Sequence, residues 1–455
     1  MMEAFGSTVA WANPPPESVP SLVTDTPGPR SQELHLEMDR LTGGSVTRGV
    51  KLHPVAYREG RGVTLTDVDG NRYLDFSSGI VVTNLGHAHP RITEAISCAA
   101  RRLDNVHEFA TPEKLAALRA LDAVTPDELT RFVFFSTGSE AIEAAMRVAR
   151  AATGRTGFVS FHNDYHGRTG GAASVTAHRA SNGMRDPGSY LVPNGHAYRC
   201  RVCTGSCDLR CAEMLGDSIE QNVAGQLAGV VLEVMTNSNG ATTYAPGYVA
   251  RVADVVHQAG GLLIADEVAT GFGRTGRWFA SDREGVVPDV LVLGKGMGNG
   301  FPVTAIAVKE EYADAVAASF PSTTYGGNPM ACAAVAEVVA VMTEEPIVEH
   351  CAAVGELTSK RLAEMAAAHP LIGDVRGRGA LHALEIVRDQ TSREPFADAG
   401  NFVFQAAFRR GLAWATAGHI LRVTPPIVIS EALMAKGLDI IEAAVAEAEA
   451  FYGYV

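Results

Sequence analysis

Two carboxylates stand at the end of an apolar stretch of the chain. The segment GLLIADEVATGFGRTG, residues 261–276, begins with an apolar run at 262–265 that is typical of a buried strand, and the run ends at Asp266 and Glu267. A buried carboxylate is costly unless a positive group meets it. The pair therefore predicts a cation at the end of this strand.

A lysine stands at the end of another apolar stretch, PDVLVLGKGMGNG. This residue, Lys295, has glycines on both sides, and glycine lets another molecule approach the backbone closely. A partly desolvated lysine has a lowered pKa and can attack an aldehyde. The alternative is a lysine in an ordinary surface turn.

A short polar turn, STGSEA at residues 136–141, leads from a strand-like stretch into a helix-like one. Backbone N–H groups at the start of a helix, together with the hydroxyls of the turn, can bind an anion such as phosphate. The alternative is an ordinary helix start with Ser139 as the capping residue.

These three features together suit pyridoxal 5′-phosphate. The lysine would form a Schiff base with the aldehyde of this cofactor, and the turn would bind its phosphate. Asp266 would pair with the pyridinium nitrogen and keep it protonated, so that the ring can accept electrons. The cofactor would then be the cation that allows Asp266 to be buried, and Glu267 is interpreted as structural.

The middle of the chain alternates strand-like and helix-like segments. Strands are predicted at RFVFF, GQLAGVVLEVM, GGLLIADEV and PDVLVLGKGM, and helical patterns at SEAIEAAMRVAR and PGYVARVADVVHQAG. This order predicts an α/β domain with a mostly parallel sheet. The ends of the parallel strands would line its ligand site.

The two ends of the chain read differently from the middle. The first 30 residues are rich in proline, serine and threonine, and GVTLTDVDGNRYLDF predicts a hairpin around Asp69 and Gly70. Beyond about residue 345 long helical stretches flank short strands, as in a smaller α+β domain. We therefore predict a mobile tail at 1–30, a small domain from 31–80 and 346–455, and a large cofactor-binding domain at 81–345.

Composition excludes several classes of protein. The 455 residues carry a formal net charge of −13 and are 46% hydrophobic, which fits a globular enzyme and argues against a nucleic-acid binder. No apolar run approaches the roughly 20 residues that span a bilayer. The start has Glu3 where a secretory signal needs positive charge, so we expect a cytoplasmic protein.

Four of the seven cysteines cluster in CRVCTGSCDLRC, at Cys200, Cys203, Cys207 and Cys211. The spacing is C-x2-C-x3-C-x3-C, whereas zinc sites usually separate two pairs by a longer loop. The spacing favours a loop of thiols without a metal, and we assign no metal ligands. Zinc or an iron–sulfur cluster is the alternative.

The chain resembles the class III aminotransferases, which are pyridoxal phosphate enzymes of fold type I. The resemblance rests on six stretches in the family's order, from about residue 45 to the C-terminus. They are LDFSSGIVVTNLGHAHPRI, FFSTGSEAIEAAMRVAR, YHGRTGGAASV, IADEVATGFGRTG, VLGKGMGNGFPVTAI and TTYGGNPMACAAV. The resemblance implies an α/β large domain with a mostly parallel sheet plus a smaller α+β domain.

The resemblance also implies roles at the cofactor. Lys295 would hold the cofactor and then carry the proton between the substrate and the cofactor, and Val268 and Tyr165 would cover the two faces of the ring. Thr324 would reach the phosphate from the neighbouring subunit, which implies a homodimer. The full set of implied cofactor-binding residues is Gly138, Ser139, Tyr165, His166, Asp266, Val268, Lys295 and Thr324.

Four more positions would meet the substrate. Arg422, in HILRVTPP, matches an arginine that holds the carboxylate of an amino-acid substrate. Arg168, in YHGRT, matches one that can meet a distal carboxylate in members that handle 4-aminobutyrate. A structural ion pair is the alternative for each arginine. Glu233 and Ile80 complete the implied substrate-binding set.

Some positions depart from the family's pattern. Val234 replaces a proline, and Ser238 stands where many members place a second glutamate that pairs with the carboxylate-binding arginine. Ala269 stands where many members place a glutamine near the cofactor. Because these changes fall around the substrate pocket, we expect ordinary cofactor chemistry and an unusual substrate.

We therefore expect a transaminase with L-glutamate or another common amino acid as donor. Its acceptor would be the oxo group of a specialised molecule, such as an oxidised amino sugar of aminoglycoside antibiotic synthesis, because the acidic chain suits a polycation. An ω-amino acid or 4-aminobutyrate type of transaminase is an alternative. So are a racemase or epimerase on the same scaffold and a cofactor-binding protein without catalysis.

Overall fold

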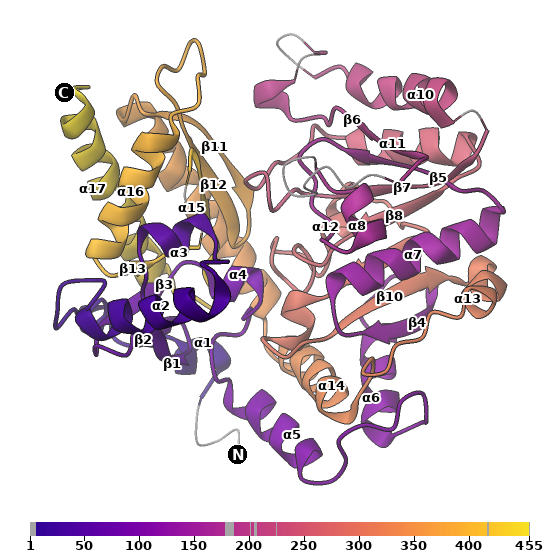
Figure 1. Cartoon of the computed structure of the whole chain (residues 1–455), viewed down its shortest axis with the longest axis horizontal. Coiled ribbons are helices and arrows are strands. Elements are labelled where there is room, and N and C mark those ends of the chain that lie inside the picture. The colour runs from indigo at the N-terminus through magenta and orange to yellow at the C-terminus, as the bar shows by residue number, and fades with distance from the viewer. Residues whose placement is uncertain are drawn as a thin grey trace. The chain divides into compact units, whose positions relative to one another are not determined.

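The computed structural model describes residues 6–177, 186–200, 202–203, 207–223, 225–415 and 418–454. The chain divides into two compact units (Figure 1). The first unit comprises Met1–Pro90, Gly273–Gly276 and Glu345–Val455, and the second comprises Arg91–Phe272 and Arg277–Glu344.

The second unit is built on a sheet of seven described strands in the order β4-β10-β9-β8-β7-β5-β6. The strands β6, β5, β7, β8 and β9 pair in parallel, and β10 lies antiparallel between β9 and β4. A mostly parallel sheet, as the alternating pattern predicts, is therefore confirmed. The bounds are β4 (Leu129–Phe135), β5 (Gly157–Phe161), β6 (Ser189–Val192), β7 (Leu227–Glu233), β8 (Leu262–Asp266), β9 (Val290–Leu293) and β10 (Thr304–Lys309).

Helices pack against this sheet. Helix α7 begins at a capping box and ends at Gly154 in the left-handed conformation, and its buried face includes Ile142 and Met146. This face packs with Val231, Ile264 and other buried apolar side chains of the sheet. The helical segments of this unit are α5 (Pro90–Ala100), α6 (Pro112–Asp122), α7 (Gly138–Thr153), α8 (Gly170–Ser174), η3 (Ala197–Arg199), α10 (Arg210–Val223), α11 (Tyr248–Gln258), α12 (Ala280–Glu284), η4 (Lys295–Gly298), η5 (Glu310–Tyr312), α13 (Ala313–Ser319) and α14 (Pro329–Glu344).

The first unit has two small sheets, β1-β2-β3-β13 and β11-β12-β14. The predicted hairpin is confirmed, because β2 and β3 pair antiparallel with Thr66 opposite Arg72. The strands are β1 (Tyr57–Arg61), β2 (Thr64–Asp67), β3 (Arg72–Asp75), β11 (Ile372–Arg378), β12 (Leu381–Ile386), β13 (Leu412–Ala413) and β14 (Ile420–Val423). The helical segments are α1 (Thr8–Ala12), η2 (Pro16–Ser18), α2 (Pro29–Thr42), α3 (Arg48–Leu52), α4 (Ser78–Val81), α15 (Ile347–Ala368), α16 (Ala397–Arg409) and α17 (Glu431–Tyr452).

Residues 6–30 pack on the first unit, which differs from the mobile tail that the sequence predicts. The backbone N–H and the hydroxyl of Thr8 donate to Glu345 at 2.7 and 2.6 Å. The side chain of Asn13 donates to the carbonyl of Val428 at 2.7 Å. Such contacts join polar groups far apart in the chain and leave no periodic pattern in the sequence.

The boundary of the first unit also differs from the predicted residue 80, since the unit continues to Pro90. His87 explains the difference, because its Nε2 lies 2.8 Å from a carboxylate oxygen of the buried Asp75. Its backbone also exchanges hydrogen bonds with Gly62. These contacts tie residues 81–87 to the hairpin.

A short segment from the middle of the chain, Gly273–Gly276, belongs to the first unit as well. The guanidinium of Arg274 is fully buried there and donates to Asn84 Oδ1 at 2.6 Å and to the carbonyl of Ala380 at 3.0 Å. Burial lowers the pKa of Arg274 to about 10.

Within the described parts of the chain, every helix is too short or too polar to cross a bilayer.

Candidate active site

The carboxyl ends of three neighbouring strands bring predicted site residues to one edge of the sheet in the second unit. Glu233 at the end of β7 pairs with Asp266 at the end of β8, and Asp266 pairs with Val292 of β9. Lys295 follows β9 directly after Gly294 and begins η4. Parallel sheets bind ligands at this edge, because the crossover helices leave a crevice there.

A histidine orients the carboxylate of Asp266, which is 6% exposed. One oxygen, Oδ2, lies 2.7 Å from Nδ1 of His166, and the other accepts the backbone N–H of Val268 at 3.0 Å. The second ring nitrogen of His166 lies 3.2 Å from the hydroxyl of Ser160. An ionised Asp266 therefore accepts a hydrogen bond from Nδ1 and is held in one orientation.

Two further buried acids surround this pair. Asp164 accepts the backbone N–H of Glu233 at 3.0 Å, and its other oxygen has no hydrogen-bond partner among the described residues. Burial and the nearby Glu233 carboxylate raise the pKa of Asp164 well above its usual range. Burial and the charge of Asp266 raise the pKa of Glu233 to about 7. Three acids packed around one imidazole favour a positively charged ligand.

The start of α7 is a capped helix end that could bind an anion. Glu140 accepts the backbone N–H groups of Ser136 and Thr137 at 3.0 and 2.9 Å, and Thr137 Oγ1 accepts the N–H of Glu140 at 3.3 Å. Gly138 and Ser139 occupy the first turn, where N–H groups lack acceptors within the helix. The helix dipole adds positive potential at this end. The capping alternative is thus partly correct, with Thr137 as the cap instead of Ser139.

The loop after β5 passes directly over this helix start. The hydroxyl of Ser139 accepts the backbone N–H of Arg168 at 3.2 Å. Gly167 has a φ of +141°, and a Cβ there would lie 2.2 Å from Ser139 Oγ. A side chain at position 167 would therefore displace the loop or the serine.

Val268 and Lys295 are placed against the same region. A Cβ at Gly138 would lie 3.8 Å from a methyl of Val268, and a Cβ at Gly294 would lie 3.1 Å from the same methyl. Lys295 is half-buried and has a φ of +44°, in the left-handed region that lysine rarely adopts. Strain of this kind persists where the surrounding structure enforces it, commonly at functional sites.

Glu233 holds the backbone around the site. Its Oε1 accepts the N–H of Tyr165 at 2.6 Å, and its Oε2 accepts the N–H of Asn237 at 2.7 Å. The resemblance implies contact between Glu233 and the substrate. In the structure both oxygens are engaged by the backbone, so that Glu233 positions Tyr165.

Glu267, the second acid of the opening pair, is structural as the sequence predicts. It is fully buried and accepts hydrogen bonds from the hydroxyl of Thr270, the N–H of Ala280, and both the N–H and the hydroxyl of Ser281, at 2.6 to 2.9 Å. It therefore fixes the start of α12 beneath the end of β8.

Replacing Glu267 by alanine is expected to destabilise the protein without touching the cofactor residues. Four buried donors would lose their acceptor, so we expect a loss of about 3 kcal/mol, or a thermal midpoint about 5 °C lower. Differential scanning calorimetry of the holoenzyme measures this shift. Glu220→Ala on the exposed face of α10 is the control, and an equal midpoint in the two variants would contradict the structural role.

Of four other predicted residues, two belong to the first unit and two expose their side chains. Arg422, in β14, and Ile80, 46% exposed, belong to the first unit. Arg422 itself is 8% exposed. The side chain of Arg168 is exposed, although its N–H contacts Ser139. Thr324 is exposed, and its carbonyl accepts from the side chain of Asn105 at 3.0 Å.

The sequence reasoning missed Asp164. This residue lies two positions before His166, in the segment that follows β5, and its carboxylate is 3.9 Å from Nε2 of that histidine. A signal was present, because an acid next to Tyr-His after a buried strand is as unusual as an acid at the end of β8. Asp164 therefore adds a third buried acid to the site.

Pyridoxal 5′-phosphate fits these surroundings. Its protonated ring nitrogen would meet the acids around His166, its phosphate would bind at the start of α7, and its aldehyde would meet Lys295. The buried Asp164 oxygen without a partner is the observation that tests the fit, because it can accept a hydrogen bond from a bound group. Fold and site together define a fold type I enzyme that depends on pyridoxal 5′-phosphate.

The chain belongs to the class III aminotransferase family, whose model matches residues 45–445. It is 35% identical over 437 residues to the 4-aminobutyrate aminotransferase of Mycobacterium leprae, covering 92% of this chain and 96% of that protein. It is 34% identical over 412 residues to the 5-aminovalerate aminotransferase of Pseudomonas aeruginosa, with coverages of 87% and 95%.

Solved structures agree with the family. The chain superposes with a TM-score of 0.84 on an amine transaminase from an uncultivated Pseudomonas species in the PLP-bound form, at 29% identity. The match covers 89% of this chain and 97% of that one. The protein is therefore an aminotransferase that uses pyridoxal 5′-phosphate, an amino donor and an oxo acceptor.

Proposed function

We propose that this aminotransferase moves an amino group between L-glutamate and an aldehyde carbon at the end of its second substrate. The match along nearly the whole chain to proteins named for 4-aminobutyrate and 5-aminovalerate carries this proposal. Both compounds bear the amine on a terminal carbon, so their oxo counterparts are aldehydes. The racemase alternative has no support among these relatives.

The residues of the second unit would divide the work as follows. The bound cofactor supplies an electron sink that acidifies the hydrogen on the carbon bearing the amine. Nζ of Lys295 would remove that proton and carry it from the substrate to the cofactor. Asp266, oriented by His166, would hold positive charge on the ring nitrogen. The N–H groups of Gly138 and Ser139 would bind phosphate.

The remaining predicted residues would hold the ring and the substrates. Val268 and Tyr165 would cover the two faces of the ring, and Glu233 would fix Tyr165 through its backbone. Arg422 would hold the carboxylate of the amino-acid donor, and Arg168 would meet a distal carboxylate. A guanidinium suits both tasks because it binds a carboxylate through two parallel hydrogen bonds.

An oxidised amino sugar, as in aminoglycoside antibiotic synthesis, is the second candidate for the acceptor. It also presents an aldehyde at a terminal carbon. Ser238, which is exposed, stands where many family members place a glutamate, so the pocket has lost one charged group. The net charge of −13 favours a polycationic molecule.

We also propose a homodimer in the cytoplasm. The exposed Thr324 lies in a segment that contacts residues 105–107, since Asn105 donates to its carbonyl and the hydroxyl of Ser322 lies 3.4 Å from Nε2 of His107. Phe109, Phe320 and Tyr325, from the same two segments, are 79%, 67% and 65% exposed. Exposed apolar side chains of this size suit a subunit interface.

A panel of substrates tests the proposed function. The purified holoenzyme is mixed with L-glutamate, 4-aminobutyrate, 5-aminovalerate or D-glutamate, and the change in cofactor absorbance is followed in a single half-reaction. The protein loaded with the amino group from L-glutamate is then given succinic semialdehyde, glutaric semialdehyde or an amino-sugar aldehyde. The proposal expects L-glutamate and at least one terminal aldehyde to react, and D-glutamate to be inert.

The two candidates for the acceptor give opposite results in this panel. Rapid reaction with the short semialdehydes identifies an ω-amino acid transaminase, whereas reaction confined to the amino-sugar aldehyde identifies the specialised acceptor. Reaction with 2-oxo acids and no aldehyde would refute the terminal-carbon proposal.

A further inference from the structure

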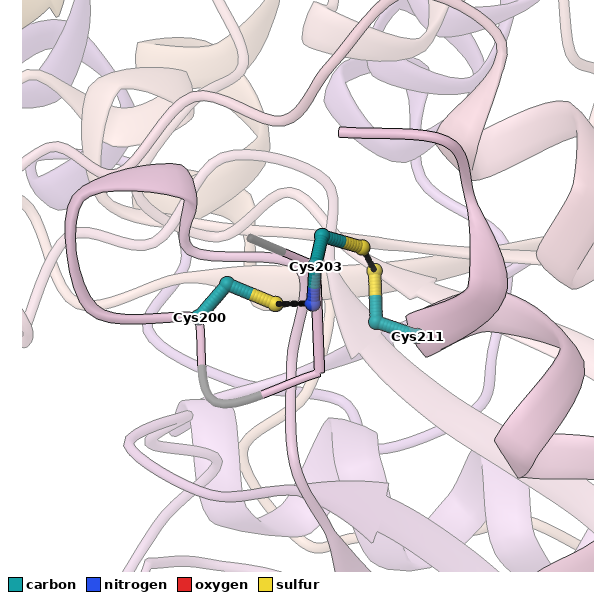
Figure 2. Close-up of side chains that lie close together, drawn as sticks. All are labelled: Cys200, Cys203 and Cys211. Carbon is teal, nitrogen blue, oxygen red and sulfur yellow. Dashed lines mark hydrogen bonds between the residues drawn. The ribbon is translucent and has the colours of Figure 1, made fainter. Parts of the chain in front are cut away.

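The four cysteines of residues 200–211 converge in space. Sγ of Cys203 lies 3.8 Å from Sγ of Cys207 and 3.9 Å from Sγ of Cys211, and the last two sulfurs are also 3.9 Å apart. The sulfurs of Cys200, Cys203 and Cys211 all lie within 4.8 Å of one another. Figure 2 shows the sulfur of Cys203 next to that of Cys211, and the sulfur of Cys200 directed toward the backbone nitrogen of Cys203.

These distances match the ligand shell of one tetrahedral ion. A Zn–S bond is about 2.3 Å, so the edge of a regular ZnS₄ tetrahedron is about 3.8 Å. Cys203, Cys207 and Cys211 form a triangle with edges of this length, and the sulfur of Cys200 lies within 4.8 Å of those of Cys203 and Cys211. An iron–sulfur cluster binds its four thiolates through two or more irons. The four cysteine sulfurs of such a cluster are therefore further apart than the sulfurs of Cys203, Cys207 and Cys211.

A backbone group is placed to stabilise a thiolate. The N–H of Cys203 donates to Sγ of Cys200 at 3.3 Å. Outer-shell hydrogen bonds of this kind orient metal ligands and support their negative charge.

The cluster is sheltered and lies at the start of a helix. Cys203 is 7% exposed and Cys211 is 2% exposed. Cys211 stands in the first turn of the 14-residue helix α10, whose dipole favours negative charge at that end. Reactive cysteines are commonly accessible to solvent, whereas burial of several thiols together suits a structural metal.

We propose that Cys200, Cys203, Cys207 and Cys211 bind one structural Zn²⁺ ion. The spacing in the sequence favours thiols without a metal, because zinc ligands usually come in two pairs with a longer loop between them. In the structure, Cys211 in the first turn of α10 lies close to the three cysteines that precede it in the chain. The ion would fix the connection between β6, at the edge of the sheet, and α10.

One carboxylate must move for this ion to bind. Oδ1 of Asp208 lies 3.2 Å from Sγ of Cys203, and a thiol can donate to it where a thiolate cannot. Asp208 already pairs with Arg210, whose Nε lies 2.6 Å from Oδ2. Loss of the thiol proton would leave Asp208 bound to Arg210, at the exposed side of the cluster.

Metal analysis of the full-length holoenzyme tests the proposal. The protein is purified under reducing conditions from cells grown with added zinc, and its zinc and iron are measured per chain. The proposal expects about one zinc ion and no iron, with four sulfur ligands at about 2.3 Å by X-ray absorption. Protein stripped by a chelator should take up about one equivalent of added Zn²⁺.

Two kinds of variant identify the ligands. In Cys203→Ser and Cys211→Ser we expect zinc to fall to less than about a fifth of an ion per chain. Cys98→Ser and Cys332→Ala, whose thiols lie outside the cluster, are the controls and should keep the full content. Should the first two variants fail to fold, X-ray absorption of the unaltered protein still decides.

Several results would overturn the zinc site. They are less than about a tenth of a zinc ion per chain in zinc-supplied protein, unchanged zinc in the folded ligand variants, and bound iron with visible charge-transfer bands. A protein mass that is lower by the two hydrogens lost when two of these cysteines form a disulfide would also refute the zinc site.

Discussion

Replacing Lys295 by alanine will abolish transamination. We expect kcat to fall by at least about 10⁴-fold, because no other group at the end of β9 can both bind the cofactor aldehyde and move the substrate proton. The backbone conformation of this lysine is unusual. Its backbone is held at a φ of +44°, after a glycine packed against Val268.

The readouts for Lys295→Ala separate chemistry from folding. Borohydride reduction of the unaltered protein should attach the cofactor mass to the peptide that contains Lys295, and the variant should show no attachment. The control is Lys360→Ala, which removes an exposed lysine and should leave kcat unchanged. Wild-type turnover in a folded Lys295→Ala variant would refute the assignment of this residue.

Replacing Asp266 by asparagine is expected to lower kcat by about 10³-fold, which is the size of effect seen when one preorganised electrostatic partner is removed. Asparagine keeps the shape of the side chain and can still accept from His166. It carries no charge, so the ring nitrogen would lose the partner that keeps it protonated. In addition, the NH₂ group of the asparagine would face the N–H of Val268 or of His166, so that two hydrogen-bond donors would oppose each other.

A cofactor analogue gives this prediction a specific test. With pyridoxal phosphate methylated at the ring nitrogen, the positive charge is permanent, and the Asp266→Asn variant should regain part of its activity. The unaltered enzyme should gain nothing from the analogue. Asp254→Asn, on the exposed side of α11, is the control. Equal loss with both cofactors would show that Asp266 acts through structure alone.

Local patterns predict much of this protein correctly. The apolar run before Asp266 and the one before Lys295 are central strands of a parallel sheet, and buried strands are short continuous apolar runs whatever their neighbours. The turn at Ser136 leads into a capped helix for reasons contained in a few consecutive residues. The resemblance to class III aminotransferases follows from such segments, and the family match confirms it.

Contacts between distant polar residues were beyond the reach of the sequence. Asp164 meets Glu233 only because β5 and β7 are neighbours in the sheet. Residues 6–30 look like a tail because Thr8 and Asn13 are held by polar contacts with residues more than 300 positions away. Neither kind of contact produces the periodic apolar signal that marks an element.

The sequence by itself determined the fold class, the family and the positions of Lys295 and Asp266, since these depend on order along the chain and on local turns. The tertiary structure decided how charge is balanced around Asp266 and how the four thiols of residues 200–211 meet. The physical reason is that burial and distance set the energies of charges and of metal ligands. Both quantities exist only once the chain is folded.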